Sequence, residues 1–183
     1  MFFARSASRP RCKHTRNVVN RILGKIRPAL LTASILCLAA HHGTASAQRV
    51  RITGLNDVTF GELTSLQFDA SRQQNVCVFS NTRTNGYSIV ASGSGLAGSF
   101  ELASGSSTLP FEVQWAESPG RSIGTSLVPN LVSQGFTSSA THQNCNSGPP
   151  AAASLIVIVR GTALSQATAG SYSGSLTLLV VPE

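Results

Sequence analysis

The stretch AGSYSGSLTLLVVPE, residues 169–183, joins a turn to the most apolar strand-like segment of the chain. Its first half is rich in glycine and serine, which favour turns. From Leu176 to Val181 only Thr177 is polar, so apolar side chains stand on both faces of the expected strand. A strand of this kind should be buried on both faces, or else be covered by a further element.

The rest of residues 48–183 repeats this pattern of short apolar runs separated by glycine, serine, asparagine and proline. No window shows the period of about 3.6 residues that marks an amphipathic helix. We expect strands at 49–53, 58–68, 75–80, 86–92, 98–103, 109–115, 154–160 and 173–181. Regular strands without helical intervals predict an all-β fold, an antiparallel β-sandwich.

Two of the expected strands have different burial patterns. In LPFEVQW, residues 109–115, the side chains of Phe111, Val113 and Trp115 share one face, and polar residues occupy the other. This alternation predicts a half-buried strand. SLIVIVR, residues 154–160, is apolar on both faces. It is therefore expected to be fully buried.

Residues 1–47 have the features of a signal peptide. Eight basic residues precede an apolar core, ALLTASILCLAA at 29–40, which is shorter than the roughly 20 residues that a permanent membrane span needs. Ala45, Ser46 and Ala47 form a small-x-small cleavage pattern, which places the cut after Ala47 and the mature start at Gln48. The alternative is an uncleaved signal anchor. We expect export to the periplasm, and then to the cell surface or the medium.

The formal net charge of +7 depends on this leader. Eight of the fourteen lysines and arginines lie within it, whereas all seven acidic residues follow the expected cut. The mature chain is therefore close to neutral and lacks the basic surface that nucleic-acid binding requires. We expect no nucleic-acid partner and no permanent membrane span.

Two of the four cysteines remain after the cut, Cys77 and Cys145. An exported protein meets an oxidising compartment, which predicts a disulfide between them. A bond between Cys77 and Cys145 would close a long loop and contribute about 4 kcal/mol to stability in the chain-entropy model. Two free buried thiols are the alternative. Zinc is disfavoured because structural sites take four ligands and only His142 stands near Cys145.

Motifs for catalysis or cofactor binding are weak. Gly93–Gly98 fits G-x-G-x-x-G, but no helix is expected after it, so a glycine-rich hairpin is the better interpretation. His142, the one histidine after the cut, lies in a polar loop, and the chain has no G-x-S-x-G motif. We expect no enzymatic activity, no cofactor and no metal. A hydrolase that uses dispersed carboxylates such as Glu112 and Glu117 is the enzymatic alternative.

Three segments carry a family resemblance. They are DVTFGEL at 57–63, NVCVFSNTRTNGYSIVASGSG at 75–95, and the terminal AGSYSGSLTLLVVPE. Together they resemble the spore coat protein U domains, which are related to the subunits of archaic chaperone–usher pili.

The resemblance implies an immunoglobulin-like sandwich that lacks its last strand. In such subunits the final strand, here 173–181, lines a groove that a periplasmic chaperone fills first and a neighbouring subunit fills later. This is a form of β-augmentation. Either Leu176, Leu178 and Val180 or the opposite set, Leu179 and Val181, would face the groove.

The chain departs from the family pattern in two ways. Family members commonly pair an early cysteine with one in the second strand, whereas here Cys145 must pair with Cys77. Few residues precede GLNDVTFG to serve as a donor strand, unless RVRIT at 49–53 is itself the donor. A subunit that accepts a strand but has little to donate would fit a tip or terminating position.

The leading hypothesis is therefore an exported structural subunit of a surface fibre or coat. A periplasmic chaperone, an outer-membrane usher and neighbouring subunits would be its partners. The alternative is a self-complete secreted β-sandwich that binds carbohydrate or another surface ligand. In that case Val50 and Ile52 would supply the closing strand in cis.

Overall fold

The computed structural model describes residues 47–183. The expected leader, including Ala45, lies outside these residues except for Ala47, which is exposed, as is Gln48. The described chain contains ten strands, one 3-10 turn and one short helix. They are β1 (Val50–Thr53), β2 (Ala70–Ser80), β3 (Gly86–Gly93), η1 (Leu96–Gly98), β4 (Glu101–Ser104), β5 (Ser107–Pro110), β6 (Glu112–Ala116), β7 (Thr125–Ser126), β8 (Val132–Thr137), β9 (Ala153–Val159), α1 (Gly161–Leu164) and β10 (Leu176–Pro182).

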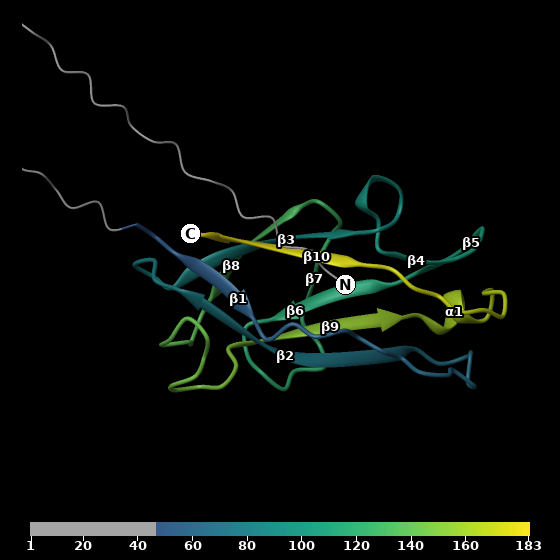
Figure 1. Cartoon of the computed structure of the whole chain (residues 1–183), viewed down its shortest axis with the longest axis horizontal. Helices are drawn as coiled ribbons and strands as arrows, with labels where there is room; N and C mark the ends of the chain where they lie inside the picture. The colour runs from purple at the N-terminus through teal and green to yellow at the C-terminus, as the bar shows by residue number, and fades with distance from the viewer. Residues whose placement is uncertain (1–46) are drawn as a thin grey trace, which may run out of the picture. The chain divides into compact units, whose positions relative to one another are not determined.

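The strands form two main sheets and a hairpin. One sheet has the order β1-β2-β9-β6-β7, the other has the order β10-β3-β8, and β4 pairs with β5. Every ladder between these strands is antiparallel. Figure 1 shows β3 and β10 lying over β2, β9 and β6. The predicted all-β antiparallel sandwich is confirmed.

The strand order corresponds to that of an immunoglobulin-type sandwich. Such a domain has strands A-B-E-D in one sheet and C-F-G in the other. Here β1, β2, β9 and β6 stand in the A-B-E-D order, while β3 and β10 stand as C and F. No strand of residues 47–183 occupies the place of G on the far side of β10.

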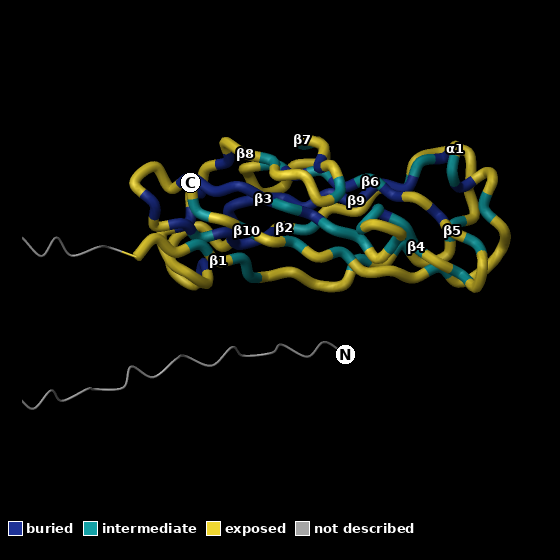
Figure 2. The backbone as a smooth tube through the Cα atoms, turned by 90° about the horizontal axis from the view of Figure 1, so that it is seen from above, coloured by how far each residue is buried: buried dark blue, intermediate teal, exposed yellow. Residues whose placement is uncertain are grey.

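The core lies between the sheets, around Trp115, Tyr87 and Ile89, none of which has any solvent exposure. Phe111 and Val113 are buried on the same face as Trp115, as the alternation in this segment predicts. All seven residues of β9 are buried, so the prediction of a strand covered on both faces is also confirmed. Figure 2 shows this buried centre within exposed loops.

Three local predictions are wrong. Residues 58–68 form no strand, and the stretch from Gly54 to Phe68 runs beside β2 without regular structure. The Gly93–Gly98 segment is no hairpin, because it leads through η1 to β4, which pairs with β5 rather than β3. The chain approaches itself closely there, since a Cβ on Gly93 would lie 2.1 Å from the carbonyl oxygen of Ser99. In addition, β8 falls in a segment with no predicted strand.

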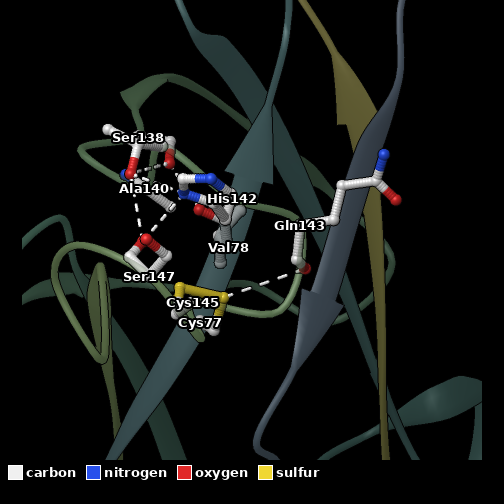
Figure 3. The surroundings of a disulfide bond; sticks show 9 residues. Cys77, Val78, Ser138, Ala140, His142, Gln143, Cys145 and Ser147 are labelled. Carbon is white, nitrogen blue, oxygen red and sulfur yellow. Dashed lines mark hydrogen bonds between the residues drawn. A yellow bond between two sulfur atoms is a disulfide. The ribbon is translucent and has the colours of Figure 1, made fainter.

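The predicted disulfide joins Cys77 on β2 to Cys145 in the loop before β9, with their Cα atoms 5.9 Å apart (Figure 3). Both cysteines are buried and pack with Ala140 and Ala152 in a small cluster of their own. His142 is exposed, and its Nδ1 lies 2.9 Å from the carbonyl oxygen of Ser147. The disulfide therefore anchors the polar loop 138–150 to the five-stranded sheet.

Candidate functional site

Strand β10 is the edge of its sheet. It pairs with β3 along its whole length, from Leu176 opposite Gly93 to Pro182 opposite Tyr87. Within the described residues no second strand hydrogen-bonds to its other side. An edge of seven residues with apolar side chains is long for an unpaired edge, since natural proteins usually shorten such edges or protect them with charges.

The side chains of β10 divide cleanly between the two faces. Leu176, Leu178 and Val180 pack against the core but remain half-buried. Leu179 and Val181 point to the opposite face and are 57% and 38% exposed. Of the two sets considered from the sequence, the first faces the interior. Its incomplete burial contrasts with the fully buried β9, so the core is less well covered along β10.

One contact at the end of β10 shows which of its main-chain N–H and C=O groups bond to β3 and which face the open edge. The N–H of Glu183 donates to the carbonyl of Gly86 at 3.2 Å. Because antiparallel pairs alternate between hydrogen-bonded and non-hydrogen-bonded, Leu179 and Val181 direct their N–H and C=O groups to β3. Leu178 and Val180 direct theirs to the open edge.

Pro182 agrees with this alternation. Proline has no N–H, so within a sheet it is confined to positions where no ladder bond is needed from it. Pro182 shares the parity of Leu178 and Val180 and faces the open edge, so it removes no bond to β3. This was a usable signal in the sequence, because a proline that ends an apolar strand favours an edge position.

Strand β1 lies on the same long side of the sandwich as β10, as Figure 2 shows. It pairs with β2, from Val50 opposite Ser80 to Thr53 opposite Cys77. RVRIT is therefore a strand of the five-stranded sheet. No ladder joins β1 to β10, so the closing strand in cis that Val50 and Ile52 would supply is not formed.

Five half-buried side chains from β1 and the following segment pack against the core near this side: Val50, Ile52, Val58, Phe60 and Leu63. With Leu176, Leu178 and Val180 they are apolar residues that the two sheets cover only in part. A strand added along the free edge of β10 would cover more of this apolar surface. We call β10 and these five residues the open side.

The carboxylates considered for catalysis are engaged elsewhere. Glu112 pairs with Arg160, whose hydrogen bonds hold the pKa of the Glu112 carboxyl below its ordinary value despite partial desolvation. Glu117 accepts hydrogen bonds from the N–H and hydroxyl of Thr137. Among residues 47–183, no three His, Cys, Asp or Glu side chains gather closely enough to bind a metal ion.

No helix in the described part of the chain combines the length and the apolar character required to cross a membrane.

Comparison with known proteins gives likenesses among solved structures only. No family model matches the chain, and no curated protein matches it either. A solved structure described as a chaperone–tip adhesin complex vital for activation of CFA/I fimbriae biogenesis aligns with a TM-score of 0.44 and 15% sequence identity. The alignment covers 74% of this chain and 41% of that chain.

Proposed function

We propose that the protein is an exported structural subunit of a surface fibre or coat, assembled by donor-strand complementation of the chaperone–usher type. A periplasmic chaperone, an outer-membrane usher and neighbouring subunits would be its partners. The open side would accept a β-strand from the chaperone first and from a neighbour later. On this view the protein passes through the periplasm to the cell surface and performs no catalysis.

The observation that carries the proposal is the state of β10. Its edge N–H and C=O groups belong to Leu178 and Val180, and the side chains of these same residues face the incompletely covered core. A single added strand would thus satisfy the edge backbone and cover the apolar side chains together. That combination is the basis of β-augmentation, in which main-chain bonds supply affinity and side-chain contacts supply specificity.

The pairing of β1 within its own domain supports a tip or terminating position. If the leader is cut after Ala47, only Gln48 and Arg49 precede β1, and β1 is paired within its own domain. Two residues extend by roughly 7 Å at most, which is too short for a donor strand. The subunit would therefore accept a strand and donate none. N-terminal sequencing of the exported protein should begin at Gln48, whereas an intact leader would contradict this position.

The proposal is tested by expressing the full chain for export and measuring the mass of the purified protein by light scattering coupled to size-exclusion chromatography. The measurement is repeated with a synthetic peptide in which valine alternates with threonine, carrying a terminal lysine at each end. Without the peptide the protein should aggregate through its open side, and with the peptide it should be a stable monomer. A monomer that is indifferent to the peptide would contradict strand acceptance.

A further inference from the structure

The edge of β2 beyond β1 is covered in an unusual way. β1 pairs only with Cys77–Ser80 of this strand, and Ala70–Val76 pair with β9 on the other side. No strand of the described chain pairs with the second edge of Ala70–Val76. Residues 56–60 lie there instead, and they are held by two side chains that project from β2.

Gln74 holds the first part of this segment. Its Oε1 accepts a hydrogen bond from the N–H of Asn56 at 2.9 Å, and its Nε2 donates to the carbonyl of Asn56 at 3.2 Å. The amide group thus bonds to both polar groups of one residue, as a neighbouring strand would do. Within residues 54–69 no main-chain group bonds to another main-chain group.

Arg72 holds the second part. Its Nε donates to the carbonyl of Thr59 at 3.2 Å and its Nη2 donates to the carbonyl of Phe60 at 3.0 Å. The guanidinium carbon also lies 5.6 Å from the centroid of the Phe60 ring, within the range of a cation–π contact. The planar fork of arginine suits two adjacent carbonyls, which a lysine could not bond in the same way.

The position of these two residues on β2 is informative. They share a face with Val76 and Val78, which are fully buried in the core. A charged residue on the inward face near a sheet edge discourages pairing by another strand. Val58 and Phe60 belong to an alternating sequence that favours strand pairing. The side chains of Arg72 and Gln74 nevertheless hold this segment in an irregular conformation.

We propose that Arg72 and Gln74 are positioning residues of the open side. They fix residues 56–60 as the wall opposite β10, so that Val58 and Phe60 present apolar side chains to an incoming strand. The same bonds keep the segment from moving across to pair with β10 and closing the sandwich in cis. This inference rests on the proposed function, because it assigns a role in strand acceptance.

The test combines amide exchange with peptide binding, using protein expressed from the full chain. Arg72→Met, Arg72→Lys and Gln74→Met are compared with the wild type and with Arg83→Met, a matched change at an exposed arginine outside the open side. The ¹⁵N order parameters of residues 56–60, which report how firmly the backbone is held, and dissociation of the valine–threonine peptide are measured. Exchange of the amides of β9 reports whether the core stays intact.

We expect both Arg72 variants and Gln74→Met to lower the ¹⁵N order parameters at 56–60 and to speed peptide dissociation about tenfold, with the β9 amides unchanged. The Arg83→Met control should match the wild type. If the wild type binds the peptide and the variants release it equally slowly, only the positioning role is overturned. If the wild type binds no peptide, the proposed function fails and the positioning role fails with it.

Discussion

Trp115 on β6 donates its indole N–H to the hydroxyl of Tyr87 on β3 at 2.9 Å, which joins the two sheets by a buried hydrogen bond. Neither residue has any solvent exposure. Burial raises the pKa of Tyr87 to about 12, although the bond from Trp115 opposes the shift. The neutral hydroxyl is therefore part of the folded core at ordinary pH.

Trp115→Phe should lower the free energy of unfolding by about 3 kcal/mol, because it removes core volume and leaves the Tyr87 hydroxyl unpaired. Adding Tyr87→Phe should restore about 1 kcal/mol, since the unpaired group is then gone. Urea unfolding followed by circular dichroism gives the free energy of unfolding of Trp115→Phe, of Tyr87→Phe and of the double variant. Simple additivity of the two single changes would show that the bond contributes nothing.

Two proline substitutions test which N–H groups of β10 bond to β3 and which face the open edge. Val180→Pro removes an N–H that faces the open edge, so the domain should fold while peptide binding falls by at least about tenfold. Leu179→Pro removes an N–H that bonds to β3, and it should destabilise the domain by about 3 kcal/mol. Thermal unfolding and peptide titration are the measurements. Equal loss of stability in the two variants would contradict the assigned parity.

Acid should weaken the five-stranded sheet, because it protonates the two carboxylates that pair with Arg160. This residue follows β9 and bonds to Asp69, just before β2, at 2.7 Å and to Glu112, which begins β6. The hydrogen bond from the N–H of Gly161 is the main cause that lowers the pKa of Asp69, and the hydrogen bond from Arg160 lowers it further. The hydrogen bond from Arg160 also lowers the pKa of Glu112.

Carboxyls with a lowered folded-state pKa stabilise the protein above their unfolded values, near pH 4, and this stability is lost as the pH falls through the folded values. The melting temperature should therefore drop below about pH 4, and less steeply in Asp69→Asn than in the wild type. Asp57→Asn, an exposed control, should keep the wild-type slope. An unchanged slope in Asp69→Asn would exclude this role for the ion pairs.

Reducing the Cys77–Cys145 bond should cost about 4 kcal/mol, because the bond closes a long loop in the unfolded chain. The double variant Cys77→Ser and Cys145→Ser should unfold at correspondingly lower urea concentration, with or without reductant. The wild type should show this shift only with reductant. A wild type that is insensitive to reductant would mean that the bond does not contribute to stability.

The alternation in the sequence was sufficient to predict most strands. LPFEVQW and SLIVIVR have the burial that their patterns indicate. Alternate side chains of a strand face opposite sides of the sheet, so the positions of the apolar residues show which sides are buried. β8 was missed, since its residues VSQGFT are largely polar and include Gly135 at a φ of 83°. Its pairing is also interrupted by an irregularity between Tyr87 and Ile89 of β3.

The open side was predictable only in part. The apolar terminal strand marked β10, but the sequence left its inward face undecided because both faces carry apolar residues. The wall was mispredicted as a strand at 58–68, because Val58 and Phe60 alternate like strand residues. What the pattern cannot show is competition from side chains distant in sequence, here Arg72 and Gln74, for the backbone groups of that segment.

The most direct test of strand acceptance is residue-resolved amide exchange along β10, with and without the valine–threonine peptide. Leu178 and Val180 should gain protection when the peptide binds, whereas Leu179 and Val181 are already protected by β3 and should change little. Binding without this odd–even difference, or no gain at Leu178 and Val180, would contradict strand addition at β10.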